Sequence, residues 1–108
     1  MWSLYLDDER TPKTTPTTGE WVVCRSVADA VKEIQLRGAF PICISFDHDL
    51  GDNVPTGFDF AKWLVEQDLD EKYQFDKHFL FNVHSANPVG SKNIEGYLEG
   101  YFRQKSFR

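Results

Sequence analysis

Basic clusters and long apolar runs are both missing from this chain of 108 residues, and each absence excludes a class of function. The 12 basic residues are outnumbered by 17 acidic ones, and they concentrate only in a short segment with Arg103, Lys105 and Arg108. Coating duplex DNA requires clustered Lys and Arg that neutralise several phosphates, so this activity is not expected. No run approaches the ~20 apolar residues of a membrane span, so we also expect no membrane association.

Cysteine is scarce as well. Cys24 and Cys43 are the two in the chain, and each lies among apolar residues. That setting is typical of buried free thiols and not of a disulfide framework. The first residues lack the charged and long apolar regions of a secretion signal. We therefore expect a cytoplasmic protein with reduced cysteines.

Apolar and aromatic residues are abundant by contrast. They make up 41% and 15% of the chain, which excludes a disordered protein. A chain of this length forms one domain and buries about two thirds of the surface that it exposes when unfolded. Residues 1–108 are therefore predicted to form a single domain whose core needs no disulfide or metal.

Apolar periodicity predicts strands that alternate with helices. Short apolar runs favour strands at 2–6, 21–24, 42–46 and 78–83, whereas prolines and threonines make 11–19 an irregular loop. Ser26 and Thr56 are suited to cap two helices, the first of which ends at Gly38. A last helix carries one apolar stripe, formed by Ile94, Tyr97, Leu98, Tyr101 and Phe102. This alternation predicts an α/β fold with a parallel sheet.

Reactive side chains follow three of the predicted strands. They are Asp7 and Asp8 after the first, Asp47, His48 and Asp49 after the third, and His84 and Ser85 after the fourth. Ligands of open parallel sheets bind outside the carboxyl ends of the strands. If the first and third strands are neighbours, their acidic ends meet at the strand spacing of ~4.8 Å. The sequence therefore predicts one site at this edge of the sheet.

The acids of this site require a positive counter-charge. The candidate metal ligands are Asp7, Asp8, Asp47 and Asp49. Like charges ~4 Å apart cost about 4 kcal/mol per pair at an effective dielectric near 20, so either a cation binds or some of the acids are protonated. Hard carboxylate oxygens favour Mg²⁺ or Mn²⁺, and nearby imidazoles shift the preference toward Mn²⁺ or Zn²⁺. The alternative is that these acids are solvated loop residues that cap helices.

Imidazole, hydroxyl and amide groups near the acids are candidates for acid–base chemistry and for phosphate binding. His48 and His84, with Asp47 beside them, are the candidate catalytic residues. Arg10 is suited to fork onto a phosphate or to pair with an acid. Residues 87–93 are expected to form a polar loop that either binds an anion or caps the last helix. The candidate phosphate-binding residues are Arg10, Ser85, Asn87, Lys92 and Asn93.

A strand that ends in paired acids, one that ends in Asp and one that ends in Ser-Ala resemble the receiver domain of two-component signalling. The resemblance implies a three-layer, flavodoxin-like α/β fold with about four parallel strands in the order 2-1-3-4. It places the metal-binding acids at Asp7 and Asp8, the phosphoacceptor at Asp47 and the family's hydroxyl residue at Ser85. The first helix is replaced by the Pro/Thr loop, and the fifth strand with its invariant Lys is missing, so that Lys92 is the one stand-in.

Four segments, in order along nearly the whole chain, give a closer resemblance. They are Leu6-Asp7-Asp8-x-Arg10-x-Pro12, Phe46-Asp47-His48-Asp49-Leu50-Gly51, Thr56-Gly57-x-Asp59 and His84-Ser85-x-Asn87-Pro88-x-Gly90-x-x-Asn93-Ile94. This pattern resembles the family of cyclic-phosphate processing receiver domains. The resemblance implies hydrolysis or opening of a cyclic phosphate on a nucleotide or an RNA end.

The leading hypothesis is therefore a phosphoesterase that acts on a small cyclic nucleotide or an RNA terminus, with Mg²⁺ or Mn²⁺ as its expected cofactor. A metal-free mechanism with two histidines follows if Arg10 neutralises the acids. The first alternative is a divergent receiver that takes a phosphoryl group onto Asp47. The second is a pseudo-receiver without chemistry that docks a protein partner. The oligomeric state is left open.

Overall fold

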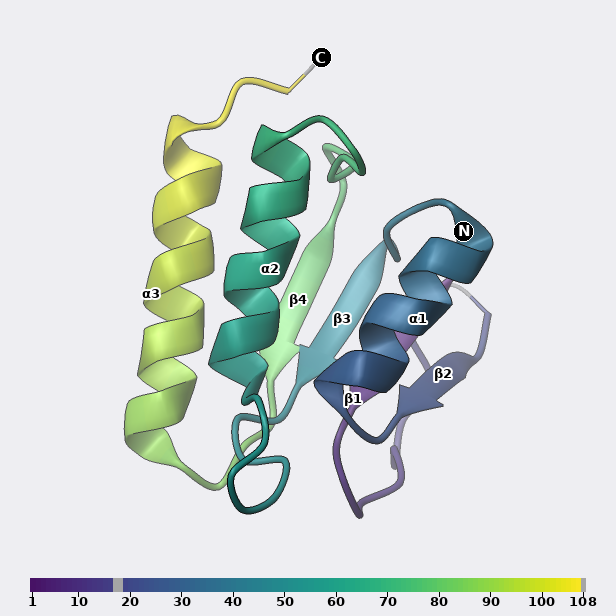
Figure 1. The fold of residues 1–108 in the computed structure, drawn as a ribbon, viewed down its shortest axis with the longest axis vertical. Helices are drawn as coiled ribbons and strands as arrows, with labels where there is room; N and C mark the ends of the chain where they lie inside the picture. The colour runs from purple at the N-terminus through teal and green to yellow at the C-terminus, as the bar shows by residue number, and fades with distance from the viewer. Residues whose placement is uncertain (17–18, 108) are drawn as a thin grey trace.

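A computed structural model describes residues 1–16 and 19–107, which form a four-stranded sheet and three helices (Figure 1). In chain order the elements are β1 (Ser3–Leu6), β2 (Trp21–Cys24), α1 (Val27–Arg37), β3 (Cys43–Phe46), α2 (Gly57–Leu69), β4 (Leu80–Val83) and α3 (Pro88–Gln104). All four strands are parallel, in the order β2-β1-β3-β4. The α/β receiver-like architecture and the strand order are as predicted.

The predicted irregular segment and the shortened carboxyl end also agree with the structure. The part of the chain described between β1 and β2, residues 7–16 and 19–20, contains no helix, and no strand follows β4 up to residue 107. Residues 17 and 18 of the predicted loop, and Arg108 of the basic segment, lie outside the described residues. The first helix and the fifth strand of a receiver therefore have no counterpart in the described chain.

Side-chain caps start the helices where the sequence predicts. The Ser26 hydroxyl accepts the N–H of Asp29 at the start of α1, and Gly38 ends this helix with a left-handed φ of 69°. Thr56 and Asp59 form a reciprocal capping box at the start of α2. The third helix begins earlier than expected, because Asn87 caps it and Pro88 is its first residue.

The main core lies between the sheet and the helices. Leu4, Leu6, Ile44 and Phe46 are fully buried and alternate along β1 and β3, so their side chains share one face. They belong to one apolar cluster with the helix residues Ile34, Phe60, Leu64, Ile94 and Leu98. The inner part of the predicted stripe on α3 is thus confirmed. Tyr97 lies at its margin against Phe58, with ring centroids 5.5 Å apart.

The opposite face of the sheet carries no helix of the described chain. Figure 1 shows α1 and α2 in front of the strands, with α3 beside α2. The alternate residues Ser3, Tyr5 and Ser45 are nevertheless buried. The three layers expected of a receiver are therefore two layers of regular structure here, since the first helix and the elements after a fifth strand have no counterpart. By strand alternation, Asp7 and Asp47, which follow β1 and β3, lie on the same face as Tyr5 and Ser45.

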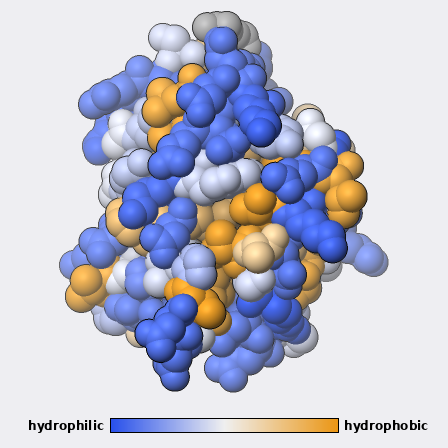
Figure 2. Space-filling view, viewed as in Figure 1, coloured by the Kyte–Doolittle hydropathy of each residue, from blue (hydrophilic) through white to orange (hydrophobic). Residues whose placement is uncertain are grey.

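Both cysteines are free thiols, as predicted, but only Cys24 is buried and Cys43 is half-buried. They lie on β2 and β3, which β1 separates in the sheet. Burial raises the pKa of the Cys24 thiol to about 11. The helix side of the molecule is mostly hydrophilic, with apolar residues in small groups (Figure 2). In the described residues, none of the helices combines the length and apolar character that crossing a bilayer requires.

The start of α2 is pressed against the residue that follows β3. A Cβ on Gly57 would lie 2.0 Å from the carbonyl oxygen of Asp47, a distance that real Cβ atoms essentially never show. The Gly57 N–H also donates to the carbonyl of His48 at 2.8 Å. This close approach fixes the backbone on which Asp47 stands.

We expect Gly57→Ala to lower the free energy of unfolding by about 1–3 kcal/mol, because the new methyl group meets rigid backbone. Gly96→Ala is the matched control. It also adds one methyl group within a helix, but the added Cβ meets nothing within 4 Å, so it should stabilise by about 0.5–1 kcal/mol. Urea unfolding of both variants measures the contrast, and equal effects would contradict the proposed close approach.

Candidate functional site

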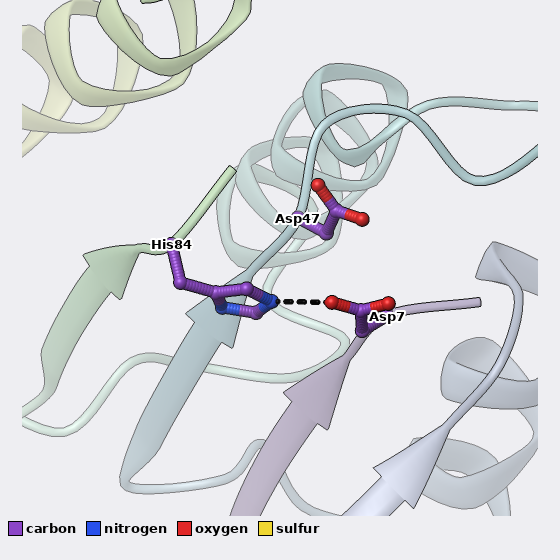
Figure 3. Close-up of side chains that lie close together, drawn as sticks. All are labelled: Asp7, Asp47 and His84. Atoms are coloured by element: carbon purple, nitrogen blue, oxygen red, sulfur yellow. Dashed lines mark hydrogen bonds and ion pairs between the residues drawn. The ribbon is translucent and has the colours of Figure 1, made fainter. Parts of the chain in front are cut away.

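Three side chains from three different strands converge at the carboxyl edge of the sheet. Asp7 follows β1, Asp47 follows β3 and His84 follows β4 (Figure 3). The parallel ladder continues through them, since Asp7 N–H donates to Cys24 C=O, Asp47 N–H to Leu6 C=O and His84 N–H to Phe46 C=O at 2.9–3.1 Å. Each of the three residues offers one ligand atom, and these atoms lie within 4.8 Å of one another. The predicted meeting of acids and imidazole at one edge is found.

The carboxylate of Asp7 is the most enclosed group of this site. Its side chain is fully buried, and one oxygen accepts the backbone N–H groups of Glu9 and Arg10 at 3.0 and 2.9 Å. The other oxygen accepts Nε2 of His84 and Nε of Arg10, both at 2.9 Å. Burial opposes ionisation, but these donors and the Arg10 charge together lower the pKa of the Asp7 carboxyl below its ordinary value. Asp7 is therefore an ionised carboxylate with both oxygens in use.

Arg10 supplies the positive charge beside the two acids. Besides its pair with Asp7, its Nη2 atom lies 3.5 Å from Oδ1 of Asp47, and Nη1 donates to the His84 carbonyl at 3.4 Å. Burial is the largest single effect and opposes the charge, yet the Asp7 and Asp47 carboxylates together raise the pKa of the guanidinium. Arg25 donates to the backbone carbonyls of Asp7 and Arg10 and so stabilises the turn between them. With 48% of its side chain exposed, Arg10 also faces solvent.

His84 is held on both ring nitrogens and on one ring face. Nε2 contacts Asp7, and Nδ1 lies 2.7 Å from the Ser45 hydroxyl. Because an ionised carboxylate only accepts, the hydrogen on Nε2 points to Asp7 and neutral His84 accepts from Ser45 through Nδ1. The ring stacks on Tyr5 with centroids 4.5 Å apart and planes within 7°. The orientation of His84 is therefore fully determined by its neighbours.

Tyr5, Ser45, Arg25 and Gly57 were not among the candidate residues from the sequence. Strand alternation contains a signal for two of them, because Tyr5 precedes Asp7 by two residues and Ser45 precedes Asp47 by two. Each therefore points to the same face as the acid that follows it. The contacts of Arg25 and Gly57 depend on the path of the loops and carry no comparable signal.

An open cleft of about 340 Å³ lies beside these residues. Its lining is Asp8, Glu9, Arg10, Asp47, Asp49, Gly51, Asp52, Ser85 and Ala86. Asp8, Asp47 and Asp49 thus share one cleft, as predicted for the four acids, while Asp7 is buried out of contact with solvent. Two further hollows surround Phe75 at the other end of the strands, away from the three converging side chains. The cleft beside Asp47 is therefore the candidate site.

The remaining predicted residues have different positions. His48 binds Asp49 through Nδ1 at 2.8 Å, and the Asn87 side chain caps α3 and donates to Asp49 at 3.3 Å. The segment predicted as a polar loop is mostly helix, because α3 begins at Pro88. Lys92 and Asn93 are exposed on this helix and are not part of the cleft lining. The cation paired with Asp47 in the described chain is therefore Arg10, and Lys92 forms no ion pair with this acid.

We expect Asp7→Asn to destabilise the protein by about 3–5 kcal/mol at pH 7, because it removes a buried charge that neutralises Arg10 and binds His84. The lowered pKa sets the sign of the pH dependence. The stability from the ionised carboxylate is present above the ordinary carboxyl pKa of about 3.9 and is lost as the pH falls through the lower folded value. The gap in unfolding free energy between the native protein and the variant should therefore narrow below about pH 4.

Urea unfolding at pH 7, 5 and 3 measures this gap. Asp70→Asn is the matched control, since Asp70 is an exposed acid at the other end of α2. It should change the free energy of unfolding by less than about 0.5 kcal/mol. A gap for Asp7→Asn that stays constant or widens toward pH 3 would contradict an ionised Asp7.

Comparison with known proteins agrees with the motifs and the fold. The family model described as the cyclic-phosphate processing receiver domain matches residues 2–100. No curated protein and no solved structure gives a significant match. The family match covers all four strands and most of α3, including every residue of the candidate site. The chain therefore belongs to the cyclic-phosphate processing receiver domain family.

Proposed function

We propose that this chain hydrolyses a cyclic phosphodiester, on a small nucleotide or at an RNA end, in the cleft beside Asp47. The observation that carries the proposal is the convergence of Asp7, Arg10, Asp47 and His84 at the open edge of the sheet. A carboxylate, an imidazole and a guanidinium within one site are the groups that activate water, protonate a leaving oxygen and bind a phosphate. The family match to cyclic-phosphate processing supports the choice of substrate class.

The cleft offers two side chains that could bind the phosphate of the substrate. Arg10 is half exposed and shares the lining with Ser85, whose hydroxyl accepts the N–H of Asn87. In the proposal these two side chains hold the non-bridging phosphate oxygens. The Asn87 side chain is already occupied by its cap and by Asp49, so the phosphate contact expected of it falls to Ser85.

Asp47 and His84 are the proposed base and acid. The oxygen of water forms a bond to phosphorus while the bond from phosphorus to one ribose oxygen breaks, which leaves a phosphate monoester. The water proton passes to the Asp47 carboxylate. His84 lies behind the cleft lining, and the leaving oxygen takes the proton that the His84 imidazolium carries on Nδ1, the nitrogen that contacts Ser45, while the Nε2 hydrogen stays directed at Asp7. Asp7 accepts from Nε2 of His84 and so stabilises that imidazolium, as carboxylates do for catalytic histidines.

A divalent cation fits part of the predicted acid set. Asp7 and Asp49 have both carboxylate oxygens hydrogen-bonded, whereas Asp8 and Asp47 line the cleft with oxygens that are not used in this way. Two carboxylates completed by waters are the usual protein share of a Mg²⁺ site. In the proposal Asp8 and Asp47 hold Mg²⁺ or Mn²⁺, which would offset the negative charge of the cleft and polarise a phosphate oxygen.

Incubation of the native protein with 2′,3′-cyclic nucleotides, with and without Mn²⁺ or Mg²⁺, tests the proposal. We expect a nucleoside monophosphate as product, and a loss of about 100-fold or more in Asp47→Asn and His84→Ala, which remove the base and the acid. Asp70→Asn should retain the native rate, because it makes the same chemical change outside the cleft.

The alternative of a divergent receiver has one observation in its favour. Asp47, its expected phosphoacceptor, lies beside a cation and lines the cleft with Asp8. It predicts no turnover of any cyclic nucleotide, together with binding of beryllofluoride that Asp47→Asn abolishes. That pair of results would overturn the proposed hydrolysis.

We also expect Arg10 to weaken the binding of a divalent cation at Asp47. Two positive charges ~4 Å apart repel by about 4 kcal/mol at an effective dielectric near 20, before screening by salt. Arg10→Gln should therefore bind Mn²⁺ at least about tenfold more tightly than the native protein. Arg37→Gln, which alters an exposed pair with Glu33 on α1, is the matched control. Titration of free Mn²⁺ by electron paramagnetic resonance measures the affinity, and weaker binding in Arg10→Gln would contradict a competition.

A further inference from the structure

His48 lies between two bracketing acids, yet its ring is directed away from the cleft that they line. Its side chain is 16% exposed. Neither His48 nor His84 is part of the cleft lining, but the His84 ring binds Asp7, whereas the hydrogen bond of the His48 ring in the described chain is to Asp49. The ring packs on the backbone of α3 at Gly90, where a Cβ would lie 2.4 Å from its Cγ. Glycine at this position is therefore a requirement of the imidazole, which occupies the space that any larger residue needs.

Three hydrogen bonds, together with the packing of the ring on Gly90, join the loop after β3 to the start of α3. Nδ1 of His48 binds Oδ1 of Asp49 at 2.8 Å, and Oδ2 of Asp49 accepts the amide of Asn87 at 3.3 Å. The Asn87 oxygen in turn accepts the N–H of Gly90 at 2.9 Å, and Gly90 is the residue on which the His48 ring packs. The loop after β3 and the start of α3 thus hold each other.

The direction of the first bond follows from the chemistry of the carboxylate. An ionised carboxylate only accepts, so Nδ1 of His48 carries the hydrogen. The same contact, followed by a smaller opposing effect of burial and a contribution from Asn87, lowers the pKa of the Asp49 carboxyl. The backbone of His48 is held too, because its carbonyl accepts the N–H of Gly57 at 2.8 Å. His48 is therefore attached to the first turn of both α2 and α3.

From this arrangement we infer that His48 is a positioning residue, which fixes Asp49 and the rim of the cleft through its Nδ1–H and takes no part in proton transfer. This replaces the expectation of a catalytic His48. The inference rests on the proposed function for its kinetic readout only. The groups that it positions are the Asp49 carboxylate directly and the backbone of Asp47 through the shared loop.

Substitution of His48 by Asn and by Gln distinguishes the roles of its two ring nitrogens. Asn places an N–H near the position of Nδ1, and Gln places one near the position of Nε2, while neither transfers protons near neutral pH. We expect His48→Ala to lower the turnover of a 2′,3′-cyclic nucleotide by about 10- to 100-fold, the usual effect of removing a hydrogen-bond partner that orients a side chain of a site. His48→Asn should recover most of that loss. His48→Gln should remain close to His48→Ala. Recovery by Gln, or a His48→Asn variant as inactive as His48→Ala while still folded by circular dichroism, would overturn the inference.

A measurement without substrate keeps this inference separate from the proposed function. Long-range ¹H–¹⁵N correlation of the native protein at pH 8 should show neutral His48 with its hydrogen on Nδ1 and with Nε2 bare. This is the less common tautomer of histidine in water, so its presence supports the bond to Asp49. The Nε2–H tautomer would overturn the inference even if hydrolysis is observed, and the Nδ1–H tautomer would support it even if no cyclic nucleotide is hydrolysed.

Discussion

The buried carboxylate of Asp7 is the interaction on which the candidate site depends. It accepts four donors from three sources, namely the turn that follows β1, the guanidinium of Arg10 and the imidazole of His84. An ion of this kind is costly to bury unless its partners satisfy it completely. Each donor is either a side chain of the site or the backbone of the turn that carries Arg10. The contacts that neutralise Asp7 therefore also place the residues of the site. The turn, the arginine and the histidine therefore have defined positions before any ligand binds.

Charge balance explains why Arg10 occupies this position. Five acids line the cleft, Asp8, Glu9, Asp47, Asp49 and Asp52, and Arg10 is the one basic residue among the lining residues. A phosphodiester entering such a cleft meets repulsion that a single guanidinium offsets only in part. The open carboxylates of Asp8 and Asp47 provide room for a second positive charge as a bound cation. The site thus combines the guanidinium of Arg10, which Asp7 holds in place, with an acidic surface that is suited to a divalent cation.

Much of the fold and the edge of the site follow from local sequence signals. Buried strands followed at once by Asp7, Asp47 and His84 predicted that these residues meet, because parallel strands bring their carboxyl ends to one edge. What sequence could not supply is the direction of each side chain after the strand ends. His48 follows Asp47 in the chain, but its ring turns toward Gly90, a residue 42 positions away whose lack of a side chain makes the space. Lys92, which was predicted in a polar loop, lies instead at an exposed position of α3, because this helix begins at Pro88.

The reduced architecture accounts for the source of the positive charge. In the receiver pattern that the sequence resembles, a fifth strand carries an invariant lysine. No strand follows β4 in the described chain, so the edge of the sheet has no scaffold there for a basic residue. The turn after β1 has one, because the two N–H groups that bind Asp7 bring Arg10 back over the strand end, within 3.5 Å of Asp47. Arg25 on the following strand end supports the same turn through two carbonyls. The positive charge beside Asp47 thus comes from the four-residue turn 7–10 and not from a fifth strand. The buried carboxylate of Asp7 holds this turn, and with it Arg10, in place.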